Sequence, residues 1–102
     1  MATVDQSKIL NYLLDVRSKD GGPKAFFFLA RGFTREAWPL FADALRSHGA
    51  RRPVIDTRKT PFGTTFVVEC GIDTPDGRNP RIRTVWITEQ TKPPRLVTAY
   101  PR

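Results

Sequence analysis

The chain ends in RLVTAYPR (95–102), which places a hydroxyl and a phenol between two arginines in a short apolar run. More basic side chains precede it in RIRTVW (81–86) and GGPK (21–24). Lysine and arginine stabilise negative charge that develops on a phosphate, and lysine or tyrosine can transfer protons when their pKa values suit the task. These residue types can cleave RNA through its own 2′-hydroxyl, because the substrate supplies the nucleophile and no metal is needed.

Other kinds of catalysis find little support in the sequence. One histidine and one cysteine are too few for the usual metal sites, and no glycine-rich phosphate loop follows a strand. We expect no metal and no cofactor, with His48 capping the end of a helix and Cys70 packing in the core. Glu69 lies among apolar residues and has two interpretations, a catalytic acid or a solvent-facing partner of a neighbouring arginine.

The charge of the chain points to a polyanionic partner. Lys and Arg number 17 against 10 Asp and Glu, which gives a net charge of +7 and a pI near 10.3. Residues 51–102 hold most of the excess, with ten basic and five acidic side chains. Arginine suits bidentate contact with phosphate, so RNA is the expected partner, while an acidic protein or simple solubility are the alternatives. The candidate RNA-binding residues are Arg78, Arg81, Arg95 and, as a stacking platform unless it packs in the core, Trp86.

Length and composition limit the architecture. A chain of 102 residues with 39% hydrophobic content fits one globular domain over 1–102. No segment approaches the roughly twenty apolar residues of a membrane helix, and the first residues lack the pattern of a signal peptide. Together with the single cysteine, this predicts a cytoplasmic protein without a membrane partner.

The first half, residues 5–49, has helical patterns. Asp5 or Ser7 can begin a short helix, and Pro23 suits the first turn of a second helix that ends at Gly32. Thr34 is expected to cap a third helix, which ends near SHG at 47–49.

The second half, residues 53–101, has strand patterns. Four segments rich in β-branched and aromatic residues cover 53–59, 64–72, 80–88 and 95–100, separated by Pro/Gly turns. Such short connections favour an antiparallel meander. We therefore predict an α+β fold, with two to three N-terminal helices packed on one face of a four-stranded antiparallel β-meander.

Strand alternation predicts which side chains face the helices. The expected helix-facing set is Phe66, Val68, Cys70, Val85, Ile87, Val97 and Ala99. The opposite, open face then carries Thr65, Val67, Glu69, Thr84, Trp86, Leu96, Thr98 and Tyr100. This assignment turns Arg81 and Arg83 toward the helices. Only a position near the strand end or a bulge would keep their charged groups from being buried. The reverse facing of the third strand stays open, because both of its sides are partly apolar.

Two segments carry a resemblance to known proteins. GGPKAFFFLARGF and FGTTFVVECGIDTPDGRNPRIRTVWITEQTKPPRLVTAYP together resemble a small bacterial domain family without assigned function, over about residues 7–101. Its members are often short open reading frames or toxin-like C-terminal modules. Helices followed by a meander that ends in VTAYP also resemble the barnase–EndoU–colicin–RelE superfamily of metal-independent ribonucleases, many of which are toxins.

The superfamily resemblance implies a set of site residues. Lys24 would be the cation from the helical region, Arg83 or Thr84 would contact the scissile phosphate, and Thr98 and Tyr100 would be the polar residues of the last strand. The catalytic histidine of several branches has no counterpart here, whereas RelE-like members use lysine, arginine and tyrosine. Each residue also has a structural interpretation, such as a solvated first-turn position for Lys24 or a strand anchor for Tyr100.

The leading hypothesis is a metal-independent ribonuclease-type toxin of a toxin–antitoxin or polymorphic toxin system. It would cleave RNA through the 2′-hydroxyl and be neutralised by an acidic antitoxin or immunity protein that covers its basic surface. The alternative is a non-catalytic RNA-binding or protein-partner module, including an antitoxin- or immunity-like role.

Overall fold

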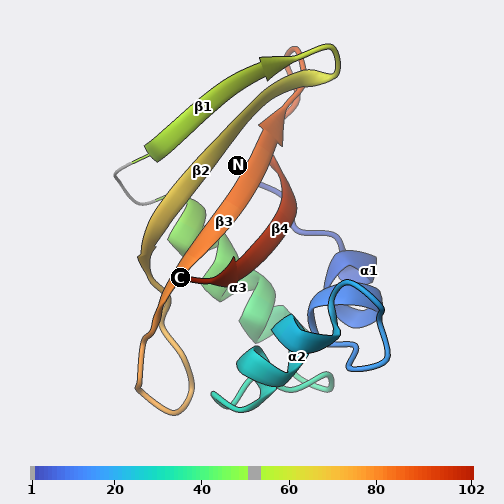
Figure 1. Cartoon of the computed structure of the whole chain (residues 1–102), viewed down its shortest axis with the longest axis vertical. Helices are drawn as coiled ribbons and strands as arrows, with labels where there is room; N and C mark the ends of the chain where they lie inside the picture. The colour runs from blue at the N-terminus through green and yellow to red at the C-terminus, as the bar shows by residue number, and fades with distance from the viewer. Residues whose placement is uncertain (1, 51–53) are drawn as a thin grey trace.

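The computed structural model describes residues 2–50 and 54–102, and it shows helices followed by strands (Figure 1). The elements, in chain order, are α1 (Gln6–Lys8), the π-helical turn η1 (Ile9–Leu13), α2 (Gly22–Leu29), α3 (Trp38–Gly49), β1 (Val54–Thr60), β2 (Gly63–Gly71), β3 (Arg81–Thr88) and β4 (Arg95–Pro101). The predicted α+β class is confirmed. Pro53, the expected start of the sheet, lies outside the described residues, as do Arg51 and Arg52.

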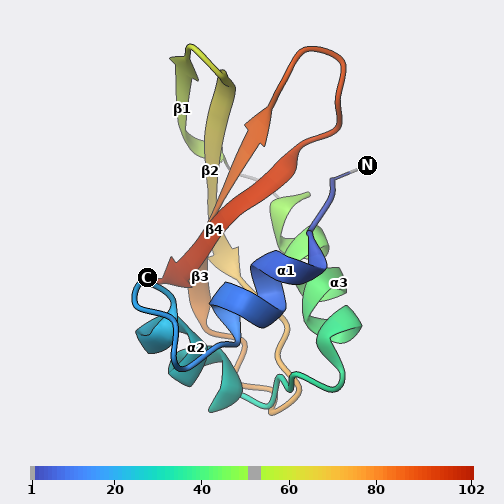
Figure 2. The ribbon, with the colours of Figure 1, turned by 90° about the vertical axis from the view of Figure 1, so that its right-hand side faces the viewer.

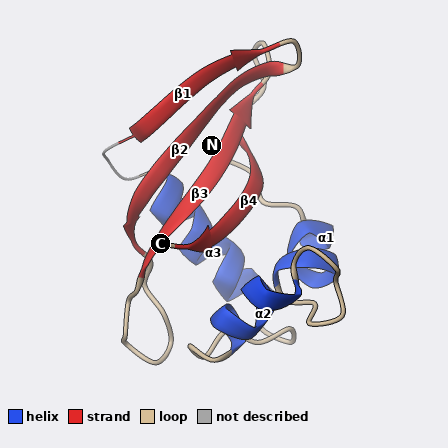
Figure 3. Cartoon of the chain, in the orientation of Figure 1, coloured by secondary structure: helices blue, strands red, loops and turns tan. Residues whose placement is uncertain are grey.

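The sheet is the predicted antiparallel meander. Its strand order is β1-β2-β3-β4, so each strand pairs with its neighbours in sequence. Helix α3 lies behind the sheet, α1 and α2 lie beside its β4 edge and lower end, and no described helix covers the other side (Figures 2 and 3). Helix α3 packs against β2 and β3, while α2 packs beside β4 at the edge of the sheet.

Local sequence explains where the longer helices begin. A proline occupies the first turn of each, Pro23 in α2 and Pro39 in α3, where a missing N–H costs nothing. Thr34 does not cap α3 as expected. Its Oγ1 accepts a hydrogen bond from the Ala37 N–H at 3.1 Å, so it closes the turn that precedes the helix.

The core forms where the helices meet the sheet. Three phenylalanines from the helical half stack together, with ring centroids 4.8 Å apart for Phe28 and Phe41 and 4.5 Å apart for Phe33 and Phe41. The sheet contributes Val68, Ile82, Trp86, Leu96 and Ala99, all buried. Burial of each large apolar side chain stabilises the fold by about 1.5–3 kcal/mol.

Strand β3 faces opposite to the primary sequence prediction. Ile82, Thr84 and Trp86 point toward the helices and are fully buried, whereas Arg81 and Arg83 lie on the open face. This arrangement buries the indole and leaves both guanidinium groups in contact with water, so no buried charge needs compensation. The prediction for β2 holds, since Val68 is buried and Phe66 and Cys70 pack against the core.

A β-bulge at Val97 sets the faces of β4. Trp86 pairs with Leu96 and Val85 pairs with Thr98, which leaves Val97 as the extra residue between them. Leu96, expected on the open face, is therefore buried, while Thr98 keeps the open-face position predicted for it.

The core contains a chain of polar contacts between α3 and β3. His48 is fully buried rather than a helix cap, and its Nδ1 lies 2.8 Å from Thr84 Oγ1. Its Nε2 lies 3.0 Å from the Cys70 carbonyl oxygen, which can only accept, so Nε2 carries a proton. The Trp86 indole donates to Thr84 Oγ1 at 2.8 Å. The Thr84 hydroxyl thus joins two buried rings, one from each element.

Candidate functional site

Three polar side chains meet where the helical half touches the β4 edge. Lys24 Nζ, in the first turn of α2, donates to Tyr12 Oη at 2.5 Å and to Thr98 Oγ1 at 3.3 Å. Tyr12 Oη and Thr98 Oγ1 are 3.1 Å apart. All three residues are half-buried, so the contacts are held in place while the polar atoms remain near the surface. We call this group the Tyr12–Lys24–Thr98 triad.

Backbone geometry brings Tyr12 to Lys24. Tyr12 lies in the π-helical turn η1, a rare conformation that often occurs at functional sites. The chain returns past it at Gly21, where an added Cβ would come within 2.3 Å of the Tyr12 carbonyl oxygen. Only glycine permits this close approach, which places the start of α2, and with it Lys24, against the phenol.

The surroundings of Tyr12 lower the pKa of its phenol. Partial burial alone raises the pKa of the phenol, but hydrogen bonds with Lys24 and Thr98 and the positive charges of Lys24 and Lys8 outweigh it. The pKa of Tyr12 therefore lies below its ordinary value of 10.0. The two ammonium groups lie 4.9 Å (Lys24) and 5.4 Å (Lys8) from the ring centroid.

A second group of charges lies on the open face of β2, β3 and the chain end. The Glu69 carboxylate accepts from Arg83 Nε at 2.8 Å, Arg102 Nε at 3.0 Å and an Arg81 guanidinium nitrogen at 3.3 Å. The Arg83 hydrogen bond, aided by Arg81 and by the charge of Arg102, holds the pKa of Glu69 below its ordinary range despite partial desolvation. We call this group the Glu69–arginine cluster.

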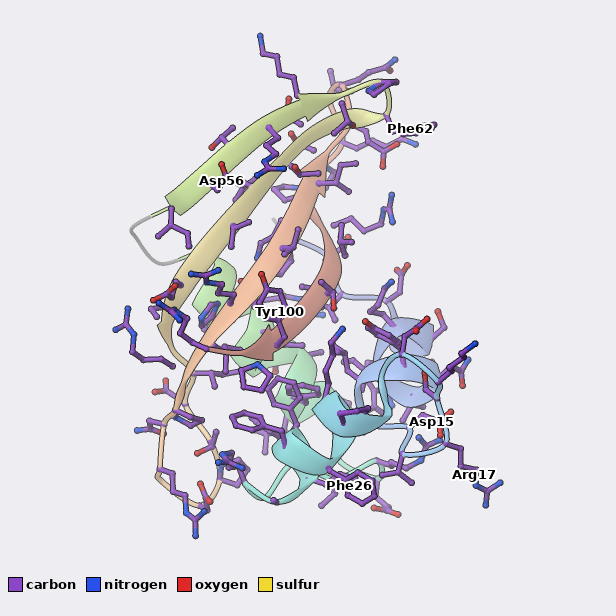
Figure 4. The ribbon with its side chains drawn as sticks, viewed as in Figure 1. Asp15, Arg17, Phe26, Asp56, Phe62 and Tyr100 are labelled. Carbon is purple, nitrogen blue, oxygen red and sulfur yellow. The ribbon has the colours of Figure 1, made fainter. Side chains whose placement is uncertain are left out.

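Tyr100 connects the two groups. It lies two residues after Thr98 on β4 and pairs with Arg83 on β3, so Thr98, Tyr100 and Arg83 share the open face. Figure 4 shows Tyr100 on the uncovered side of the sheet. Hydrogen bonds of Arg83, first with Glu69 and then with Tyr100, raise the pKa of its guanidinium, which stays charged.

Four of the five residues expected to be catalytic are brought together. Lys24 and Thr98 belong to the triad, and Tyr100 and Arg83 extend it across the open face. The fifth, Thr84, is placed on the opposite face and is fully buried, so its predicted contact with the scissile phosphate is wrong.

The expected RNA-binding residues are scattered. Arg81 belongs to the Glu69–arginine cluster, but Arg78 pairs with Asp76 at 3.4 Å in the β2–β3 loop, and Arg95 pairs with Glu89 at 2.8 Å where β4 begins. Trp86 is fully buried against α3, so the predicted base stacking on it is wrong. The indole is needed for the core, where no nucleotide can reach it.

Tyr12 is a site residue that no pattern in the sequence indicated. It lies among Ile9, Leu10, Leu13 and Leu14, so it resembles one more core position of an amphipathic helix. The only signal was its chemistry, because it supplies the one phenol in residues 2–50. Arg102 was counted only as charge, although it contacts Glu69 directly.

The described residues offer neither a metal-binding cluster nor a membrane-spanning helix. Within residues 2–50 and 54–102, no three His, Cys, Asp or Glu side chains lie close enough together to hold a metal ion. No helix in those ranges is long and apolar enough to cross a membrane.

Comparisons with known proteins give a family and a fold. The model of a family described as a domain of unknown function (DUF6883) matches residues 1–102. No curated protein matches the sequence. A chain of the contact-dependent growth inhibition toxin–immunity protein complex from Klebsiella pneumoniae 342 has a similar structure, with a TM-score of 0.81 and 12% sequence identity over 98% of this chain and 99% of that one. At this identity the likeness shows a shared fold.

Proposed function

The chain belongs to the DUF6883 family of domains of unknown function. From the geometry of its site, we propose that it is a metal-independent ribonuclease-type toxin. The observation that carries the proposal is the contact of Lys24 with Tyr12 and Thr98. Thr98 shares the uncovered face of the sheet with Tyr100 and Arg83. The similar fold of a chain from a toxin–immunity protein complex supports the toxin class.

The site residues suit cleavage of RNA at its own 2′-hydroxyl. Arg83 presents a permanent charge that can hold the scissile phosphate in a defined orientation. Lys24 adds a second positive charge at Thr98, two positions before Tyr100 on β4, where it can stabilise the phosphorane oxygens. Thr98 and Tyr100 supply hydroxyl groups between the two cations. Attack of the 2′-oxygen breaks the bond to the 5′-oxygen and leaves a 2′,3′-cyclic phosphate and a 5′-hydroxyl.

An acidic protein is the partner that this surface would require in a producing cell. The net charge of +7 attracts an acidic immunity protein or antitoxin, which would cover the open face and exclude RNA. The complex that holds the similar chain contains an immunity protein as well as a toxin.

The same complex favours a second candidate function, an immunity-like role without catalysis, because the complex that holds the similar chain consists of a toxin and an immunity protein. Induced expression in bacteria separates the two functions. A toxin arrests growth, whereas an immunity-like protein leaves growth unchanged.

The direct test is RNA cleavage by the purified chain in the presence of EDTA. We expect cleaved RNA with 2′,3′-cyclic phosphate ends, and a loss of about 100-fold or more in rate for Lys24→Ala. Lys59→Ala is the matched control, because Lys59 is exposed on β1 at the opposite edge of the sheet. Wild-type-like cleavage by Lys24→Ala, or intact tRNA and mRNA with the wild-type chain, would contradict the proposal.

A further inference from the structure

We propose that Tyr12 is the catalytic residue that accepts the proton of the 2′-hydroxyl, and that Lys24 supplies the proton for the leaving 5′-oxygen. The inference rests on the ribonuclease function proposed above and adds a residue that the sequence did not single out. Its basis is the position of the Tyr12 phenol, whose oxygen lies 2.5 Å from Lys24 Nζ and 3.1 Å from Thr98 Oγ1.

Other ionisable groups near the site are poorly placed to accept this proton. The Glu69 carboxylate is occupied by three arginines, and its lowered pKa makes it a weak base. His48 is fully buried on the helix-facing side of the sheet, where it bonds to Thr84 and to main-chain carbonyls. Tyr100 is a partner of Arg83, which is needed for the phosphate.

The charges around Tyr12 are suited to a phenolate. Lys24 reaches it from α2 and Lys8 from α1, while β4 contributes only the uncharged hydroxyl of Thr98. Hydrogen bonds with Lys24 and Thr98 and the charges of Lys24 and Lys8 lower the pKa of the phenol. Positive charge close to the oxygen stabilises the state that can take up a proton.

The proposed step balances without an added reactant. The Tyr12 phenolate removes the proton from the 2′-hydroxyl as the 2′-oxygen forms its bond to phosphorus. The bond from phosphorus to the 5′-oxygen breaks, and the Lys24 ammonium transfers a proton to that oxygen. Tyr12 is then a neutral phenol and Lys24 a neutral amine. Their direct hydrogen bond lets the proton pass back from oxygen to nitrogen, which restores the starting state.

The composition of the chain permits a specific test. The chain contains two tyrosines, so in Tyr100→Phe the remaining tyrosine is Tyr12. Fluorotyrosine lowers the pKa of a phenol with little change in size, and it can replace tyrosine throughout the expressed protein. We expect the rising limb of the pH–rate profile to move to lower pH on fluorination in the wild-type chain. The same shift is expected in Tyr100→Phe, in which loss of the Tyr100 hydroxyl lowers the cleavage rate at every pH. An unmoved limb, or a shift that Tyr100→Phe abolishes, would overturn the inference.

Tyr12→Phe provides the second measurement. The variant keeps the ring and its packing, so it should fold and bind RNA while the cleavage rate falls by about 100-fold or more. Cleavage by Tyr12→Phe at the wild-type rate would overturn the role of Tyr12 and leave the ribonuclease proposal intact. Absence of cleavage by the wild-type chain would instead overturn the ribonuclease proposal, and this inference with it.

Discussion

Glu69 neutralises cations on the face where the proposed phosphate site lies. Its carboxylate accepts from three arginines and is only 13% exposed, so RNA phosphates have to compete with it for these guanidinium groups. Because its pKa is lowered, its stabilising contribution is present above the ordinary carboxyl pKa and is lost as pH falls through the lowered value. Glu69 therefore both fixes the arginines and limits how strongly they attract RNA.

Glu69→Gln should bind single-stranded RNA more tightly than the wild-type chain. Removal of the carboxylate frees three arginines, and the slope of log K against log salt should become steeper by as much as about 2. Fluorescence anisotropy over a range of salt concentrations measures this slope.

Glu89→Gln is the control for that change, because it removes the same charge but frees only Arg95. Its slope should steepen by about 0.7. Equal slopes for the two variants, or weaker binding by Glu69→Gln, would show that the Glu69–arginine cluster takes no part in contact with RNA.

The sequence was sufficient to name individual polar residues but not to assemble them. Lys24, Thr98 and Tyr100 were named through the resemblance of GGPK and VTAYP to a ribonuclease superfamily. Tyr12 could not be separated from the core residues beside it, since its role depends on a contact with Thr98, 86 positions later in the chain. No local pattern reports such a contact.

At the scale of elements, helices and strands were predicted to within one or a few residues, whereas the face of β3 and the side of Leu96 in β4 were not. Pro/Gly turns mark the strand ends clearly, as at TPFG before β2. Both sides of β3 are partly apolar, so alternation alone could not assign its face. Strict alternation of side chains along a strand cannot predict the bulge at Val97. The bulge moves Leu96 to the buried side while Thr98 stays on the open face.

The polar chain between α3 and β3 gives a test of the revised facing. Thr84→Val removes the hydroxyl that contacts His48 and Trp86, and the loss of these buried hydrogen bonds should cost about 1–3 kcal/mol of unfolding free energy. RNA cleavage should be unchanged at temperatures where the variant is folded. Urea unfolding and the cleavage rate measure the two effects.

Thr98→Val is the matched substitution on the open face. It removes the contacts with Lys24 and Tyr12, so cleavage should fall while stability changes little. If Thr84→Val abolished cleavage without loss of stability, Thr84 would belong to the site. The assignment of Thr84 to the helix-facing side of β3 would then be contradicted.

At the scale of the whole molecule, α3 covers one side of the sheet, and no helix of the described residues covers the other side, which offers room for a large ligand (Figure 2). The triad lies where α2 and η1 meet the β4 edge, and the Glu69–arginine cluster lies further across the same open face. An RNA strand that crosses from one to the other would pass Tyr100. The helices at the β4 edge and the open face of the sheet therefore contribute different groups to one proposed site.

The measurement that tests this account most directly uses one RNA oligonucleotide in two forms. After the cleaved bond is mapped with end analysis in EDTA, the ribose on its 5′ side is replaced by 2′-deoxyribose and nothing else is changed. If the 2′-oxygen of the substrate is the nucleophile, the all-ribose form is cut to a 2′,3′-cyclic phosphate and the substituted bond stays intact. Cleavage of the substituted bond would contradict it, since the attacking oxygen would then not come from the substrate.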